Sequence, residues 1–374
     1  MKRKLHLSIV LALIISSINT YSQIYSDYDF DSTRIASEEY NYILPILGEK
    51  THDLGFDLPR PLGLSVNYIW QQSNILISDV SIGFNNSELI NVDELINFNE
   101  TTSSTHGLSF RPDVWILPFL NIYGILATAN SQTFVDVSVG IPNIDRGFDE
   151  LFNIQTNVDV PTTTFGFGLT PTVGVLGGWI ALDMNMTWTN VETLDENVFT
   201  FVFDPRIGKS FNFKKPERNI SVWVGAFGLN INRNTSGSIA FNEVMDADKW
   251  HEKINTGQDK VGEAQIELDD WWGNLTPIEK NNPVNIARKE GNQKKLDVAG
   301  VVLVAAEDAV ENAENSTIKY ALDKRPASIW NFTLGSQFQI NKRWMIRLEY
   351  GGLSNRKHVI GGLQYRFGLG KRKS

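Results

Sequence analysis

The feature that most constrains this chain is a strict alternation of apolar and polar residues over segments of about ten residues. One such segment spans 328–340, where from Trp330 onward every second residue but Ser336 is apolar and the residues between are polar or small. The apolar series is Trp330, Phe332, Leu334, Phe338 and Ile340, and the other series is Asn331, Thr333, Gly335, Gln337 and Gln339. A period of two indicates a β-strand with one apolar face.

The same alternation recurs along most of the chain. It predicts strands at about 62–72, 75–86, 105–115, 119–130, 162–174, 178–190, 197–211, 219–231, 328–340, 343–351 and 357–367. The first two segments share parity, which is consistent with one long strand. Because single-chain bacterial barrels usually hold an even number of strands, we predict ten, or twelve if 132–141 also crosses the membrane.

Two fold classes carry strands of this kind, a membrane β-barrel and a soluble β-sandwich. A sandwich would bury its apolar face against a second sheet and carry denser charge on the other face. Aromatic residues near the predicted strand ends and an export sequence before the strands favour the barrel. We therefore predict an all-β fold, a transmembrane antiparallel β-barrel of about 10–12 strands with a helical insertion in one long extracellular loop.

The first residues have the layout of a secretory signal peptide. Three cations at 2–4 precede an apolar stretch at 5–15, and small or polar residues follow as far as Ser22. The apolar stretch is too short to span a bilayer with margin. Together with the strand pattern, this segment predicts export and residence in the outer membrane of a Gram-negative cell.

Loop lengths predict the direction of the strands. Short connections at 117–118, 177–178, 214–218 and 341–342 fit periplasmic turns, and longer segments at 131–161, 191–196, 232–327 and 352–356 fit external loops. The resulting division is a signal peptide at 1–22, a periplasmic lead-in or plug at 23–60, a first barrel part at 61–231, a mostly helical extracellular insertion at 232–327, the C-terminal strands at 328–368, and a basic tail at 369–374.

The insertion changes its hydrophobic period from two to about 3.6. Apolar or small residues recur at steps of three and four from Trp250 to Trp271, which predicts an amphipathic helix. Thr276, Pro277 and Glu279 have the spacing of a capping box that starts a second helix. The apolar segment 296–310 fits either a helix or a strand buried on most sides.

The alternation also places eight charged residues on the predicted inner face of the barrel. These lumen-lining candidates are Arg111, Asp113, Asp183, Asp204, Arg206, Arg347, Glu349 and Arg366, four cations and four anions. Charges inside a narrow barrel either pair into a closed polar core or line a water-filled path. Since the set comes close to balance in sign, the sequence leaves both open.

Several classes of chemistry find little support. There is no cysteine and no His cluster, so we expect no metal and no cofactor. Ser354 and His358 have a spacing that could seat a nucleophile and a base, but the same residues are expected in any polar hairpin tip, and we predict no enzyme. A formal net charge of -9 argues against a nucleic-acid partner.

Three segments of the sequence carry a resemblance to a known group. They are the run from Arg111 to Gly124, the helical insertion with Trp271 and 275–277, and the closing run from Gly362 to Phe367. With these, residues 60–368 resemble Gram-negative, Bacteroidota-like outer-membrane β-barrel proteins of uncharacterised function that are often called transporters. The resemblance implies the fold and location and supplies no functional residues. One departure is the tail after Phe367, because barrels of this kind commonly end on that aromatic residue.

Two functions are consistent with the sequence. The first is a passive channel or transporter for a small solute, gated by the helical insertion. The second is a non-conducting structural or interaction barrel whose insertion binds another envelope component. The expected partners are outer-membrane lipid, the barrel assembly machinery during insertion, and a small solute or an envelope protein.

Overall fold

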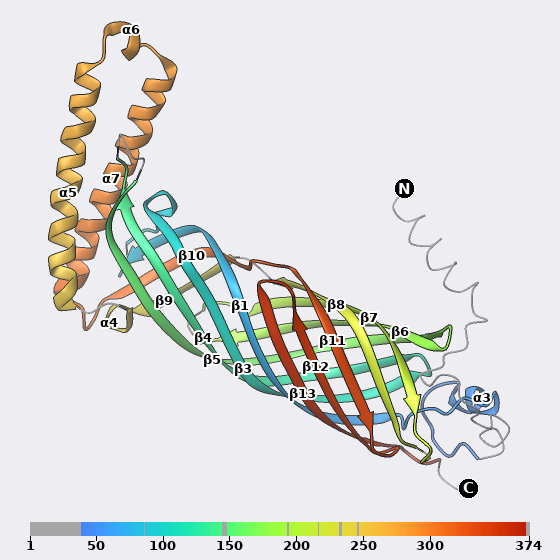
Figure 1. The fold of residues 1–374 in the computed structure, drawn as a ribbon. Coiled ribbons are helices and arrows are strands. Elements are labelled where there is room, and N and C mark those ends of the chain that lie inside the picture. The colour runs from blue at the N-terminus through green and yellow to red at the C-terminus, as the bar shows by residue number, and fades with distance from the viewer. Residues whose placement is uncertain are drawn as a thin grey trace, which may run out of the picture.

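A computed structural model describes residues 39–371, with gaps at 86, 144–147, 193, 216, 232–233 and 245–246. The predicted signal peptide at 1–22, the first part of the lead-in at 23–38 and tail residues 372–374 lie outside the described residues. A short helix, α3 (Gly48–Asp53), lies in the lead-in at the same end of the molecule as the C-terminus (Figure 1).

Ten antiparallel strands form a closed ring, because the last strand pairs with the first (Figure 1). In ring order they are β1 (Leu62–Phe84), β3 (Ile96–Leu117), β4 (Leu120–Ile141), β5 (Asp149–Val175), β6 (Gly178–Val191), β7 (Val198–Asn212), β8 (Asn219–Ile231), β11 (Trp330–Gln339), β12 (Trp344–Gly352) and β13 (Arg356–Phe367). The predicted ten-stranded barrel is confirmed, and 62–84 is one continuous strand.

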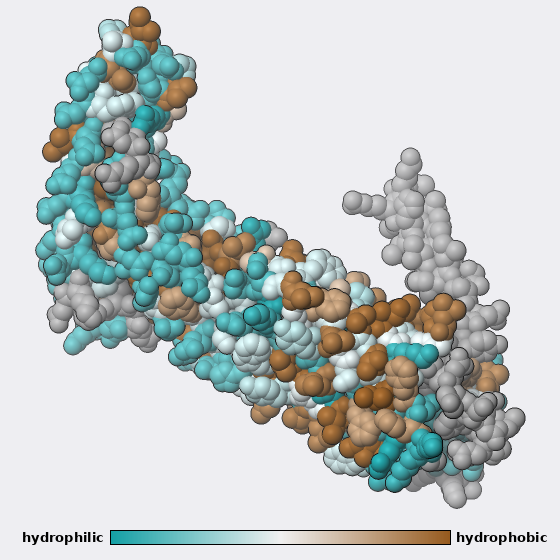
Figure 2. Space-filling view, viewed as in Figure 1, coloured by the Kyte–Doolittle hydropathy of each residue, from teal (hydrophilic) through white to brown (hydrophobic). Residues whose placement is uncertain are grey.

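The outer wall of the ring is apolar over the part that all ten strands share. Outward side chains that stay largely exposed include Leu64, Val66, Leu108, Phe110, Phe165, Phe167, Val222, Leu334, Ile346, Leu348 and Leu363. Figure 2 shows apolar side chains concentrated on the visible face of the barrel, whereas polar side chains predominate on the visible face of the helical part. Such a belt is stable only in contact with lipid, and the closed ladder leaves no unpaired strand edge there.

One side of the barrel is much taller than the other. Strands β3, β4 and β5 have 22, 22 and 27 residues, whereas β11 and β12 have 10 and 9. Above Asn74, β1 leaves β13 and pairs with β10 (Thr317–Pro326), which pairs with β9 (Asn234–Ala240). We call these upper parts of β1, β3, β4 and β5, together with β9, β10 and the short β2 (Ile90–Asn91), the upper tier.

The expectation that 131–161 forms a loop is wrong, because β4 and β5 continue through most of it as a paired hairpin. The apolar residues change faces along β4, and this hid the strand. Ile122 and Leu126 point outward to lipid, but Val137, Val139 and Ile141 have the opposite parity and point inward. Outside the bilayer the outer face meets water, so the apolar residues of the upper tier belong on its inner face.

The insertion contains two long antiparallel helices, which we call the helical hairpin. These are α5 (Ala247–Asn274) and α7 (Pro283–Glu311), with the short α4 (Phe241–Val244) before them and α6 (Pro277–Lys280) between them. The predicted helix over 250–271 is confirmed, and 296–310 is helical within α7. None of the described helices is long and apolar enough to span a bilayer.

The base of the helical hairpin packs on the inner face of the upper tier. Trp250 of α5 contacts Phe152 of β5 edge to face at 5.1 Å, and Leu268 of α5 packs with Ile141 of β4. Phe152 has the parity of the lumen-facing Thr170, and both lie on the same strand. The hairpin base therefore lies on the lumen side of the tier, above the barrel.

The capping box at the tip of the hairpin is confirmed. The Thr276 hydroxyl accepts a hydrogen bond from the Glu279 backbone N–H, and the Glu279 carboxylate accepts from the Thr276 backbone N–H at 2.8 Å. The hydroxyl and the backbone N–H of Thr276 hold the pKa of Glu279 below its usual value. This arrangement fixes where α6 begins.

The packing predicts two different outcomes for isoleucine truncations on α5. Ile254 is 1% exposed between the hairpin and the tier, and Ile266 is 64% exposed. Ile254→Ala should weaken docking of the hairpin by about 2–4 kcal/mol, because it removes buried contacts and leaves a cavity. Tryptic cleavage within the hairpin should become at least tenfold faster. Ile266→Ala is the matched control, and equal cleavage rates for the two variants would contradict the docking described here.

Candidate functional site: the charged lumen

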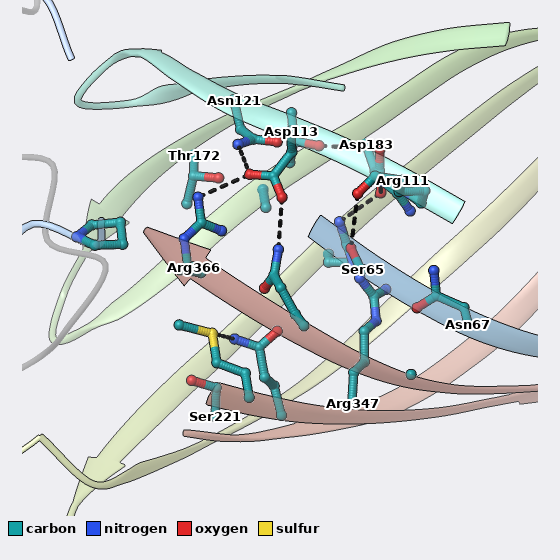
Figure 3. A pocket seen from close by; sticks show the side chains of 18 of the residues that line it. Ser65, Asn67, Arg111, Asp113, Asn121, Thr172, Asp183, Ser221, Arg347 and Arg366 are labelled. Atoms are coloured by element: carbon teal, nitrogen blue, oxygen red, sulfur yellow. Dashed lines mark hydrogen bonds and ion pairs between the residues drawn. The ribbon is translucent and has the colours of Figure 1, made fainter. Parts of the chain in front are cut away.

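The eight charged residues expected on the inner face all point into the barrel. Six of them form one connected cluster, and Asp113 and Arg366 form a separate pair. Six line a cavity inside the mouth formed by the short turns, namely Arg111, Asp113, Asp183, Arg206, Arg347 and Arg366. The other two, Asp204 and Glu349, contact Arg206 from above the cavity. Figure 3 shows the side chains around this cavity, contributed by strands from all sides of the ring.

Arg206 of β7 is the centre of the charged cluster. Its guanidinium lies 3.0 Å from the Asp183 carboxylate, 3.5 Å from that of Asp204 and 4.0 Å from that of Glu349. All four side chains are buried. A buried arginine is stable when carboxylates surround it in this way, because each charge replaces the water that the others have lost.

Asp183 of β6 joins the cluster to residues of β3, β4 and β5. Its carboxylate accepts hydrogen bonds from the Tyr123 hydroxyl and, at 3.1 Å, from the Thr170 hydroxyl. Arg111 lies 3.9 Å from the same carboxylate, and its guanidinium stacks 3.8 Å from the centre of the Tyr123 ring. Tyr123 could not be identified from the sequence, because its partner Asp183 lies 60 positions away along the chain.

Glu349 of β12 anchors the other side of the cluster. It accepts from Arg347 at 2.7 Å and from the Trp223 indole N–H at 3.2 Å. The Arg347 guanidinium lies 5.0 Å from the centre of the Trp223 ring, within the range of a cation–π contact. In Figure 3, Arg347 extends across the lumen toward Asp183.

A second ion pair lies nearer the mouth formed by the short turns. Asp113 accepts from Arg366 at 2.8 Å, from the Asn121 amide at 2.8 Å and from the Gln364 amide at 2.8 Å. Arg366 also donates from Nε to the backbone carbonyl of Arg60 at 2.9 Å. This pair therefore ties β3, β4 and β13 to the end of the lead-in.

The cavity has a volume of about 200 Å³ and lies between the charged cluster and the lead-in. Pro59 contributes to its lower wall, and Asp57 pairs with Lys342 of the β11–β12 turn at 2.9 Å. The tail after β13 is also held there, because Lys371 pairs with Glu49 at 2.7 Å. The lead-in thus lies against the mouth formed by the short turns.

The upper lumen contains two buried basic residues that the sequence analysis did not place among the lumen-lining set. Arg356 is 1% exposed and donates to the Phe227 carbonyl at 3.1 Å. It was assigned to the loop 352–356, although its parity matches His358, so the alternation could have found it. His358 lies 3.9 Å from Glu349.

Ser354 and His358 do not contact each other directly. The Ser354 hydroxyl donates to the Asn331 side-chain oxygen at 3.0 Å, and the Asn331 nitrogen lies 3.4 Å from His358 Nδ1. The absence of enzyme activity stays a prediction. Among the described residues, no group of three or more His, Asp or Glu side chains is arranged to hold a metal ion.

Comparisons with known proteins show only distant likenesses. No family model and no curated protein match this chain. The β-domain of the Bordetella autotransporter BrkA is similar over 81% of this chain and 99% of its own, at 7% identity and a TM-score of 0.32. An outer-membrane channel from Pseudomonas putida F1 is similar over 83% and 97%, at 10% identity and a TM-score of 0.27. A Pseudomonas aeruginosa FadL homologue is similar over 82% and 90%, at 8% identity and a TM-score of 0.26.

All of these solved structures are outer-membrane proteins or parts of them. Within this chain, the ring closed by β1 and β13 and the apolar belt around it are the features of an outer-membrane β-barrel. The protein is placed in the outer membrane on that physical ground.

The cluster predicts a large cost for removing one carboxylate. Asp183→Asn should lower the free energy of unfolding by about 3 kcal/mol, because Arg206 and Arg111 lose a buried partner. Urea titration of the refolded barrel, followed by tryptophan fluorescence, measures the difference. Asp159→Asn on the exposed part of β5 is the matched control and should change stability by less than about 0.5 kcal/mol. An equally small effect for Asp183→Asn would contradict a cluster that stabilises the barrel.

Proposed function

We propose that this protein is a gated outer-membrane conduit for a small solute and that the structure corresponds to its closed form. The observation that carries the proposal is the cavity inside the periplasmic mouth, which ends at a cluster of ion pairs across the lumen. A barrel that served only as an anchor could fill this space with apolar side chains. Replacing buried ion pairs by apolar residues is often neutral or stabilising, so the charges point to a use other than stability.

Unpartnered polar atoms at and above the cluster support a path through it. Asp204 Oδ1 and Thr333 Oγ1 are buried and have no hydrogen-bond partner among the described residues. Buried polar atoms of this kind are normally satisfied by water. They continue from the cavity toward the upper tier, along the axis that a solute would follow.

The position of the helical hairpin is evidence for a gate at the end of the lumen that lies below the upper tier. Its base packs against inward-facing residues of β4 and β5, on the lumen side of the upper tier. Movement of the hairpin would change access to the lumen from outside the cell. This is the gating role that we propose for the insertion.

A second function, binding of another envelope component, is favoured by the tip of the hairpin. The hairpin projects beyond the upper tier (Figure 1), and Ile278 and Val284 near its tip are 84% and 71% exposed. Exposed apolar side chains at the end of a projecting element are typical of a contact surface. In that case the lumen would remain closed and the barrel would be an anchor.

Single-channel recording separates the two functions. The mature chain and a variant with 247–311 replaced by a short Gly-Ser linker are refolded and inserted into planar bilayers. We expect discrete openings from the mature chain and more frequent openings from the variant, because the linker removes the hairpin from the lumen side of the tier. A variant that replaces only 275–282 at the tip is the matched control and should conduct like the mature chain.

Silence from all three forms, with folding verified by heat-modifiable gel migration, would contradict the conduit and favour the interaction barrel. Openings that are unchanged by removal of the hairpin would contradict the gate alone.

A further inference from the structure

The charges that face the cavity are not balanced, although the whole set of eight is. Four arginines and two aspartates line the cavity, namely Arg111, Arg206, Arg347, Arg366, Asp113 and Asp183. The two remaining carboxylates, Asp204 and Glu349, contact Arg206 and Arg347 but do not line the cavity. The wall that a solute would meet is therefore cationic.

Arg111 and Arg347 are the arginines most open to this space. Their side chains are 26% and 24% exposed, whereas those of Arg206 and Arg366 are 7% and 5% exposed. Arg111 has only a long contact of 3.9 Å with a carboxylate, and Nε of Arg347 has no partner among the described residues. Both guanidinium groups lie against aromatic rings. This contact fixes the plane of each guanidinium group and leaves its N–H groups directed away from the ring.

The remaining wall is partly aromatic. Trp115, Trp179 and Trp223 line the cavity, and the rings of Trp179 and Trp223 are 6.1 Å apart. The indole N–H of Trp115 is buried and has no partner among the described residues. Indole rings contribute flat apolar surface to the cavity.

From these observations we infer that the cavity is a binding site for a small organic carboxylate. Its carboxylate would lie between Arg111 and Arg347, where guanidinium N–H groups can donate two bonds to one anion. Its apolar body would lie against the tryptophans. An apolar cavity of about 150 Å³ can hold benzene, so about 200 Å³ is enough for one ring with a carboxylate. The inference names the solute class of the proposed conduit and rests on that function for its biological role.

Direct binding tests the inference without requiring conduction. Benzoate is titrated into the refolded mature chain in detergent micelles, with calorimetry and tryptophan fluorescence as readouts, and benzyl alcohol is the neutral probe of similar shape. We expect saturable binding of benzoate at least tenfold tighter than that of benzyl alcohol. Acetate, which lacks the ring, should bind more weakly than benzoate.

Three variants assign the contacts. Arg111→Gln should weaken benzoate binding at least tenfold and leave benzyl alcohol unchanged, and Arg111→Lys should restore most of the affinity because it keeps the charge. Arg343→Gln, at the exposed β11–β12 turn, is the matched control and should bind like the natural chain. Heat-modifiable migration of each variant shows whether the barrel has folded.

Equal affinities for benzoate and benzyl alcohol, or no saturable binding of benzoate by the folded chain, would overturn the inference. So would equal losses for Arg111→Gln and Arg343→Gln. Benzoate binding by a barrel that never conducts would support the carboxylate site and contradict the proposed conduit. Conduction without benzoate binding would support the conduit and contradict the proposal that its solute is an organic carboxylate.

Discussion

The pairing of β13 with β1 is the contact on which the rest of this structure depends. Twelve residue pairs, from Leu62 with Phe367 to Ser73 with Arg356, close the ring. Without them, two strand edges would carry unpaired N–H and C=O groups into lipid, where each such group costs several kcal/mol. The end of this pairing at Ser73 also determines where the upper tier begins, because β1 exchanges β13 for β10 at the next residues.

Closure with only ten strands makes the lumen narrow, and this explains its chemistry. Inward side chains from strands that are not neighbours come within contact distance, so Arg206 of β7 can contact Glu349 of β12. A charged side chain in such a space is stable only beside an opposite charge, because little bulk water reaches it. The cluster is therefore a consequence of barrel width together with the alternation that directs these charges inward. Within the lumen, Asp204 and Glu349 lie above the cavity, and the more open arginines Arg111 and Arg347 face it.

Much of the barrel follows from the sequence because lipid imposes one simple rule on the outer face. Every second residue must be apolar, and that pattern revealed the ten strands and the eight inward charges. In the upper tier the apolar residues lie on the inner face instead, because the outer face contacts water and the inner face contacts helices. Val137 and Ile141 therefore continue the strand of Leu126 with opposite parity, and the segment resembled a loop. The partners of each charge could not be predicted either. Contacts such as Tyr123 with Asp183 join residues 60 positions apart and depend on strand register.

The taller side of the barrel gives the helical hairpin a position that a flexible loop would not have. β9 and β10 hold its two ends, and β10 in turn is paired with β1, which continues into the membrane as a single strand. A displacement of the hairpin base would thus act on the strand that closes the ring. In β1, the register shifts between Ser78 and Ser81, where Asp79 has a positive φ of 54°. Such a bulge bends the strand between membrane and tier. After the bulge, Ile82 and Phe84 lie on the face that packs with the insertion. One irregular position in β1 therefore fixes how the insertion is placed above the lumen.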